Sequence, residues 1–167
     1  MTIKNLKKVL EFDIMKLDPT NKQILSILQE DGSITNAELS KKIGLAPAST
    51  LERVKKLEKN GIIRKYVALV DAEKIGKEIA VFVEITMNAH SSDSIKQFSR
   101  EIAKIPEVLE CHHVAGDSDF LLKVITDSIK SYETFALEKL AVLPHVGTVN
   151  THFVLSMIKS ETAIYPD

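Results

Sequence analysis

The chain contains 167 residues, of which 22 are Lys or Arg and 23 are Asp or Glu. Hydrophobic residues make up 44% and charged residues 27%, and these proportions exclude a disordered chain, a collagen-like chain and a membrane bundle. The single cysteine, Cys111, excludes an intramolecular disulfide and is typical of a protein from the reducing cytoplasm. Apolar runs are far shorter than the ~20 residues of a membrane span, so no membrane partner is expected.

Charge is distributed unevenly along the sequence. Residues 1–65 hold 13 Lys and Arg against 8 acids, a net of +5, whereas residues 66–167 hold 9 against 15, a net of −6. Such an asymmetry indicates one half that meets an anion and one half that does not, although chance can also produce differences of this size.

The first half predicts three short helices between residues 18 and 61. The first helix is expected from Asp18-Pro19 to Asp31-Gly32, the second from Thr35 to Gly44, and the third from Pro47 to Asn60-Gly61. Asp, Thr and Pro favour helix starts, Thr35 with Glu38 forms a capping box, and Gly favours helix ends. The short link Gly44 to Ala46 is typical of a helix-turn-helix, whose second helix enters the DNA major groove.

The remaining chain predicts a strand followed by two similar β-α-β units. Residues 62–70 are expected to form the strand, which could be a wing, a linker or both. The units comprise strand 79–87, helix 93–105 and strand 108–114, then strand 120–126, helix 129–143 and strand 146–158. Equivalent residues of the two units are 37 positions apart at Phe98 and Phe135 and 38 apart at Pro106 and Pro144. The second helix is therefore expected to carry one inserted residue. This pattern predicts a ferredoxin-like β-α-β-β-α-β domain whose uncovered sheet face forms a dimer.

The third helix carries the main candidates for DNA contact. With Leu51, Val54 and Leu57 facing inward, the opposite side is expected to show Ser49, Thr50, Arg53, Lys56 and Asn60, flanked by Lys55 and Lys59. Arg can read guanine, and Lys neutralises phosphate. The alternative is a solvated basic helix face.

Two further groups could carry chemistry. In the loop from Gly116 to Asp119, the carboxylates can accept hydrogen bonds from an ammonium group, although a plain polar turn fits equally well. Within Cys111-His112-His113, the first and third residues share a strand face, but no metal-ligand spacing supports a metal site. The lone Cys is expected on a buried strand, where a thiol is normally unreactive, and the sequence has no phosphate-binding Gly-rich loop. We therefore expect no catalytic residues and no cofactor.

An ordered set of short motifs resembles the Lrp/AsnC (feast/famine) transcriptional regulators over residues 17–158. In the first half the motifs are Leu17-Asp18, Ile24-Leu25, Asp31-Gly32, Ala37-Glu38-Leu39, Gly44-Leu45, Leu51-Glu52-Arg53-Val54, Leu57 and Gly61-Ile62. In the second half they are Phe82-Val83, Glu110-Cys111, Gly116-Asp117, Asp119, Leu121-Leu122-Lys123 and Leu143-Pro144. The stretch from Glu110 to Lys123 is most similar to the leucine-responsive branch.

The resemblance implies an α+β protein, with an N-terminal winged helix-turn-helix and a C-terminal ferredoxin-like domain that dimerises and binds a small effector, often an amino acid. The implied layout is an extension over 1–16, a DNA-binding domain over 17–64, a linker strand over 65–78, the effector and oligomerisation domain over 79–158, and a tail over 159–167. Dimers would assemble into tetramers or octamers, with effector pockets between dimers. The implied DNA contacts are Pro47, Ser49, Thr50, Arg53, Lys56 and Lys59, and the implied effector residues are His113, Gly116, Asp117, Asp119, Ile129, His152 and Phe153.

Some features depart from this pattern or stay open. The family often has Ser at the N-cap where this chain has Ala46, and a lost N-cap costs about 1 kcal/mol of helix stability. His113 and His152 stand where relatives have apolar or aromatic residues, which affects the choice of effector. Residues 1–16 could form an amphipathic helix or a flexible arm. The alternative function is an enzyme resembling the sirohaem decarboxylases, which share the two-domain architecture and use histidines near the ligand pocket. His112 and His113 motivate this alternative.

Overall fold

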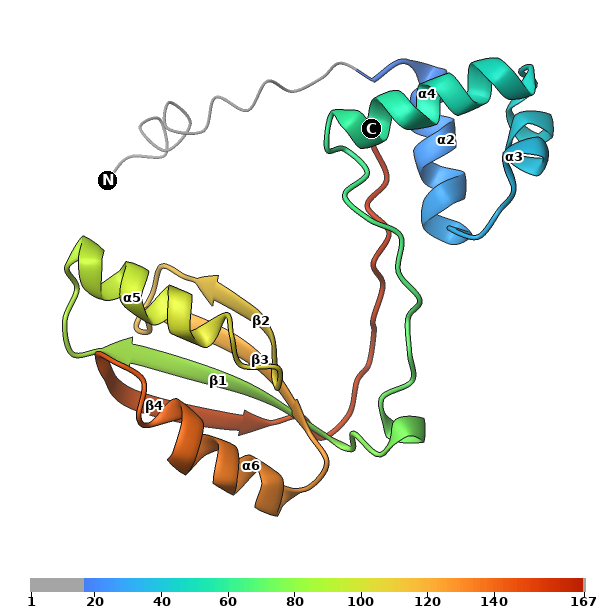
Figure 1. The fold of residues 1–167 in the computed structure, drawn as a ribbon. Helices are drawn as coiled ribbons and strands as arrows, with labels where there is room; N and C mark the ends of the chain where they lie inside the picture. Colours follow the sequence, from blue (N-terminus) through green and yellow to red (C-terminus); the bar gives the residue numbers. More distant parts are fainter. Residues whose placement is uncertain (1–16, 167) are drawn as a thin grey trace. The chain divides into compact units, whose positions relative to one another are not determined.

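The computed structural model describes residues 17–166, and the chain forms two compact units (Figure 1). The described part of the first unit is residues 17–68 together with 160–166, and the second unit is residues 69–159. The helix or arm expected over residues 1–16 lies outside the described residues. Among the described residues, no helix is both long enough and apolar enough to cross a membrane.

The first unit contains the three predicted helices, so the helix-turn-helix prediction is confirmed. They are α2 (Pro19–Glu30), α3 (Asn36–Ile43) and α4 (Pro47–Lys59). The Asp18 side chain caps α2, the Thr35–Glu38 capping box starts α3, and Gly44 ends α3 with the positive φ of 70° that glycine adopts readily. The helices enclose a small core of four buried side chains, Ile24, Leu25, Leu39 and Leu57.

The strand predicted over residues 62–70 is wrong, because the described structure assigns no strand there. The amide N–H groups of Ile62 and Ile63 both donate to the carbonyl of Leu57 and so close α4. Both isoleucine side chains are half-buried against the helical core. The first two apolar residues of the run therefore pack on a helix end instead of joining a sheet ladder.

The C-terminal residues belong to the helical unit. The amide side chain of Gln29 on α2 accepts a hydrogen bond from the Ile164 N–H at 2.7 Å and donates one to the Ile164 carbonyl at 2.9 Å. This pair of bonds attaches the end of the chain to the helix-turn-helix unit, 135 residues away in sequence.

The second unit is a four-stranded antiparallel sheet with the order β2-β3-β1-β4. Its elements are the 3-10 turn η1 (Glu73–Ile75), β1 (Ile79–Met87), α5 (Ser92–Ile102), β2 (Val108–His113), β3 (Phe120–Thr126), α6 (Ile129–Phe135) and β4 (Val146–Phe153). Figure 1 shows α5 and α6 over one face of the sheet. The ferredoxin-like prediction is confirmed.

Side chains alternate between the two faces of this sheet. The helix-covered face contributes Val81, Val83, Ile85, Met87, Phe120, Leu122 and Val124 to a core of twelve buried residues, together with side chains of the helical segments. On the other face, called the open face here, Phe82 is 39% exposed between Lys123 and His152 in the strand register. The open face also carries Glu84, Glu110, His112 and Leu121.

Three predicted boundaries in this unit need correction, and the first is that of the helix expected over residues 93–105, which ends at Ile102. The second helix is α-helical only to Phe135 and then widens into a π-helical turn, Ala136–Leu140, in which the Ala141 N–H donates to the Ala136 carbonyl. Such a wide turn accommodates one additional residue, in agreement with the insertion expected between Phe135 and Pro144. The last strand ends at Phe153 instead of residue 158, and the Val154 N–H still donates to the carbonyl of Ala80 on β1.

Candidate DNA-binding surface and effector site

The side of α4 that faces the core differs from the predicted one. Thr50 and Leu57 are fully buried, whereas Leu51 is 42% exposed. The Thr50 hydroxyl donates to the carbonyl of Ala46 at 3.1 Å, so its polar group is satisfied inside the protein. The placement of Thr50 on the outer face and of Leu51 on the inner face was therefore wrong, and Thr50 is removed from the candidate DNA contacts.

Arg53 joins α4 to the start of α2. Its guanidinium lies 2.6 Å from Asp18 Oδ2 and 3.0 Å from Asn21 Oδ1. The hydrogen bond from Arg53, followed by the Asn21 N–H, holds the pKa of Asp18 below its ordinary value. The guanidinium is thus engaged within the protein, so Arg53 has a helix-positioning role that sequence analysis missed.

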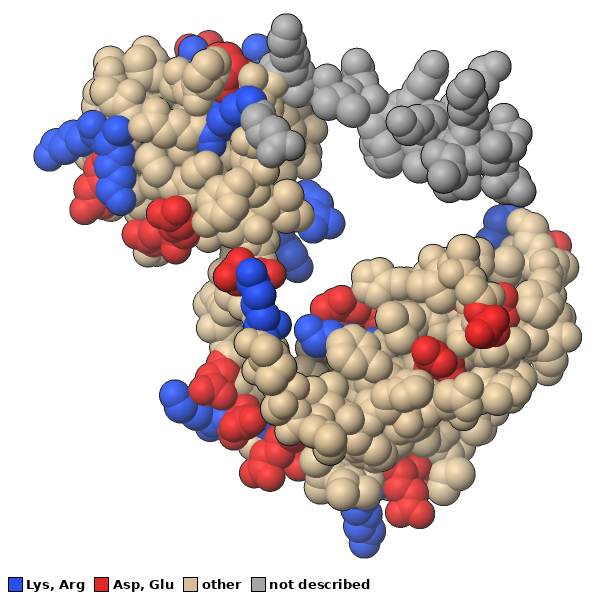
Figure 2. All heavy atoms as spheres, turned by 180° about the vertical axis from the view of Figure 1, so that it is seen from behind, with Lys and Arg blue, Asp and Glu red and all other residues tan. Residues whose placement is uncertain are grey.

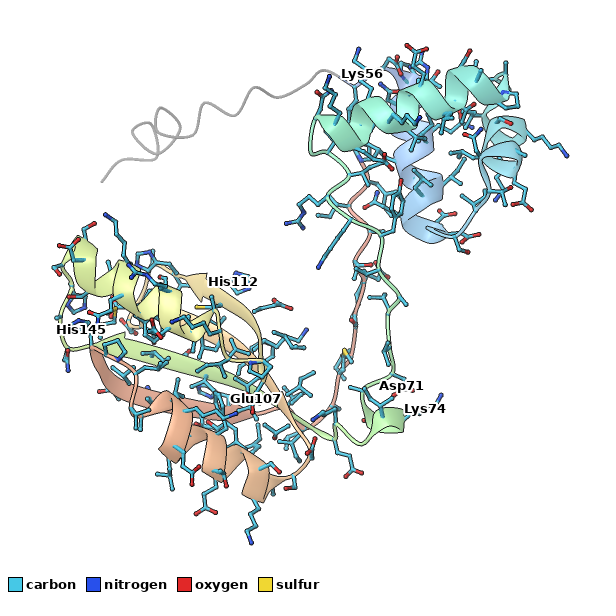
Figure 3. The ribbon with its side chains drawn as sticks, viewed as in Figure 1. Lys56, Asp71, Lys74, Glu107, His112 and His145 are labelled. Atoms are coloured by element: carbon cyan, nitrogen blue, oxygen red, sulfur yellow. The ribbon has the colours of Figure 1, made fainter. Side chains whose placement is uncertain are left out.

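The exposed surface of α4 is basic. Ser49, Lys55, Lys56 and Lys59 are exposed, and the three lysines form no ion pair with any residue in the range 17–166. Pro47 is the first residue of α4, and its carbonyl accepts a hydrogen bond from the Asn36 side chain at 2.9 Å. Lys56 projects outward in Figure 3, and Figure 2 shows Lys and Arg side chains at the margins of the helical unit. Free lysines on one helix can neutralise phosphates.

The loop between β2 and β3 is tied to the end of β1. Asp119 Oδ2 accepts a hydrogen bond from the Met87 N–H at 2.7 Å and lies 3.1 Å from His90 Nε2. The Met87 N–H, followed by the charge and hydrogen bond of His90, lowers the pKa of Asp119. One carboxylate oxygen is thus already used within the chain. Sequence spacing gave no signal for His90, because the strand register brings it to the loop.

The predicted effector residues form two groups within one chain. His113 stacks on Phe120 beside the loop from Gly116 to Asp119, at the end of the sheet where β1 finishes. Ile129 and Phe153 lie at the opposite end, where β1 begins; Phe153 packs edge-on against Tyr132, and Ile129 is exposed. His152 lies on the open face, 3.6 Å from Glu84. One chain does not bring the seven residues into one pocket.

The second unit also contains a cavity of about 420 Å³. Residues from the linker and from the start of β2 line it, among them Val70, Ile75, Lys77 and Glu107. None of the seven predicted effector residues lines this cavity. Figure 3 labels Glu107 near the end of the sheet where β1 begins.

The histidines of β2 point to opposite faces of the sheet. His112 pairs with Leu121 on the open face and contacts Glu110 at 3.1 Å, whereas His113 lies on the helix side against Phe120. Cys111 is exposed on this edge strand, so its predicted burial was wrong. In the part of the chain that the structure describes, no three His, Cys, Asp or Glu side chains gather to hold a metal.

Comparisons with known proteins define the class of the two units. Residues 17–64 match a family described as winged helix-turn-helix DNA-binding, and residues 80–164 match the Lrp/AsnC ligand binding domain. A helix-turn-helix joined to a ligand-binding domain is the architecture of a transcriptional regulator.

The relatives make the assignment more specific. The chain is 40% identical over 148 residues to the leucine-responsive regulatory proteins of Salmonella typhimurium and Escherichia coli, covering 89% of this chain and 90% of theirs. It is similar in structure to a Neisseria meningitidis transcriptional regulator solved as an L-Met complex, with a TM-score of 0.84, 34% identity and coverage of 89% and 96%. It is also similar to an AsnC family transcriptional regulator from Agrobacterium tumefaciens, with a TM-score of 0.83, 36% sequence identity and the same coverage of the two chains. The chain belongs to the Lrp/AsnC family of transcriptional regulators.

Proposed function

We propose that this regulator binds duplex DNA as a symmetric homodimer through α4, and that an amino acid bound by the second unit adjusts its assembly and DNA affinity. The division into a DNA-binding part over 17–64, a linker over 65–78 and an effector and oligomerisation part over 79–158 belongs to the proposal. The carrying observation is the exposed basic surface of α4, where Lys55, Lys56 and Lys59 have no ion-pair partner among the described residues. The start of α4 next to this surface carries Pro47 and Ser49, and the ion pair of Arg53 with Asp18 holds the helix in position.

Salt-dependent binding tests the role of the lysines. The probe is the duplex that the wild-type protein selects from a random-sequence library. Lys56→Ala and Lys59→Ala should each weaken binding to all sequences about equally. Because each variant removes one phosphate contact from each of the two α4 helices, the slope of log K against log salt should fall by about 1.8. Lys130→Ala, an exposed lysine on α6, is the matched control and should change neither quantity. Slopes equal to wild type in both α4 variants would contradict the proposal.

The open face supports the homodimer. Half-exposed Phe82, with Leu121 and Ile125 beside it in the register, is apolar surface that a second copy can cover. Because a two-fold dimer presents two α4 helices, the DNA site should be a pseudo-palindrome with half-sites one or more whole helical turns apart. Phe82→Asp should raise the dimer dissociation constant in sedimentation experiments, and an unchanged value would place the interface elsewhere.

The two groups of effector residues fit a pocket shared between copies. Since the loop from Gly116 to Asp119 with His113 lies at the opposite end of the sheet from Ile129 and Phe153, only two chains can bring these groups together. This arrangement agrees with a tetramer or octamer built from dimers. The printed names of the relatives, leucine-responsive proteins and an L-Met complex, favour an aliphatic amino acid as the effector.

A thermal-shift screen against the twenty amino acids tests the effector, because a ligand of the native state raises its stability. The loop is then tested with Asp119→Asn, since asparagine keeps an acceptor for the Met87 N–H and removes the negative charge. This variant should bind DNA like wild type and lose the response to the amino acid found in the screen. A response equal to wild type would show that the pocket lies elsewhere.

A cytoplasmic place of action follows from the proposal, since the partner is genomic DNA. No catalytic role is proposed. The enzyme alternative was motivated by His112 and His113, and these side chains lie on opposite faces of the sheet, so they do not converge on one ligand.

A further inference from the structure

Leu51 is an exposed aliphatic side chain in the N-terminal half of α4. It is the fifth residue of the helix and is 42% exposed, while its neighbours Thr50 and Val54 face the core. Helical spacing places Pro47, Ala48 and Lys55 next to Leu51 on the helix surface. Leu51 and Ala48 therefore form a small apolar patch on the surface that presents the lysines.

DNA offers a matching apolar group in the major groove. The C5-methyl of thymine distinguishes this base from cytosine, and aliphatic side chains can read it by contact. In a helix-turn-helix, base edges are reached by the N-terminal residues of the recognition helix, and Leu51 lies in that part of α4. Leu51 is thus placed where a base edge would cover it.

The strongest polar candidate on the helix is engaged elsewhere. Arg53 binds Asp18 and Asn21, so its guanidinium is held toward α2 in this structure. The Thr50 hydroxyl is bonded to Ala46 and is fully buried. In this half of α4, Ser49 is exposed but short and Glu52 is exposed but acidic, which leaves Leu51 as the exposed aliphatic side chain that can contact a base edge.

We propose that Leu51 determines part of the sequence preference of this regulator by packing against a thymine methyl group in each half-site. The proposal rests on the proposed function, since it requires α4 to enter the major groove. Lys55, Lys56 and Lys59 would hold the helix against the phosphates, and these contacts carry no sequence information.

Replacing thymine by uracil tests the contact, because uracil lacks only the C5-methyl. In the duplex selected by the wild-type protein, each thymine of one half-site is replaced in turn, and the affinity is measured by fluorescence anisotropy. At one position, loss of the methyl should weaken wild-type binding about fourfold, the factor expected for one buried group of this size. Leu51→Ala should bind the thymine duplex more weakly and lose the difference between thymine and uracil.

Two further variants keep the test decisive. Leu51→Gln retains the length of the side chain at an exposed position, and it should also lose the difference if Leu51→Ala does not fold. Leu137→Ala removes an exposed leucine of the other unit and should keep the fourfold difference. If no uracil position affects wild-type binding, or if both Leu51 variants keep the effect, the proposal is wrong. A protein that selects no sequence from the library would instead refute the proposed DNA-binding function.

Discussion

In the helix-turn-helix unit, side chains at helix ends make the defining polar contacts, whereas in the ligand-binding unit strands far apart in sequence hold each other. Asp18 and Thr35 start α2 and α3 with bonds to residues three positions away. In the second unit, β1 pairs with both β3 and β4 along its length. Among the described residues, the core of the helical unit contains four buried hydrophobic side chains and that of the ligand-binding unit twelve. The unit with the smaller core should therefore be the less stable one.

Both units nevertheless use an acidic side chain where the candidate functional element meets the rest of the unit. Asp18 holds Arg53 of α4, and Asp119 holds the end of β1 against the loop. In each case the carboxylate has a depressed pKa, caused by an arginine in one unit and mainly by a backbone N–H in the other. Helix α4 is thus positioned by an ion pair, and the candidate effector loop by a charge-assisted backbone hydrogen bond.

The largest expected effect comes from removing one core side chain in each unit. Phe98→Ala should cost about 3–5 kcal/mol in the ligand-binding unit, and Leu57→Ala about 2–5 kcal/mol in the helical unit, since both residues are fully buried. Calorimetry should show two transitions, with Leu57→Ala lowering the first and Phe98→Ala the second. A single transition that both variants lower would show that the two units unfold as one.

The sequence predicted the two units for different reasons. The starts and ends of α2, α3 and α4 were predicted within about two residues, because Asp18, Thr35, Gly44 and Pro47 act locally. The topology of the ligand-binding unit was also predicted, because its two β-α-β units repeat. The rotation of α4 was not predicted, because positions 50, 54, 57 and positions 51, 54, 57 both follow helical spacing. Tertiary packing buries Thr50 and leaves Leu51 exposed.

The effector residues were the least predictable part of the molecule. The partnership of Asp119 with His90 depends on the register between β1 and β3, which no local pattern encodes. The separation of Ile129 and Phe153 from the loop likewise appears only once the strand directions are known. Local patterns therefore predicted the elements, while long-range pairing decided which side chains meet.

A smaller effect is expected from Arg53→Ala, which separates helix positioning from base reading. Because the ion pair with Asp18 is partly exposed and solvent screens it, its loss should lower the stability of the helical unit only slightly. Affinity for the selected duplex and for random DNA should fall by the same factor, since α4 is less well held. Arg100→Ala on α5 is the control in the other unit. A tenfold or greater fall in the ratio of selected to random affinity would show that Arg53 reads a base.

The smallest effect concerns pH and the carboxylate of Asp119. Its pKa is depressed below the ordinary Asp value near 4 in the folded state, so the ionised form stabilises the fold. This contribution is complete above pH 4 and is lost as the pH falls through the lower, folded pKa. Below pH 4, the stability of the ligand-binding unit should therefore fall less steeply in Asp119→Asn than in wild type, with a difference of less than about 1 kcal/mol. The stability of the helical unit, to which Asp18 contributes, should fall as it does in wild type. Asp117→Asn is the matched control, because that exposed carboxylate forms no hydrogen bond within residues 17–166.

Thermal unfolding followed from pH 3 to 7 measures the stability of both units. If the stability of the ligand-binding unit falls equally with pH in Asp119→Asn and in wild type, the bond to Met87 does not depend on the charge.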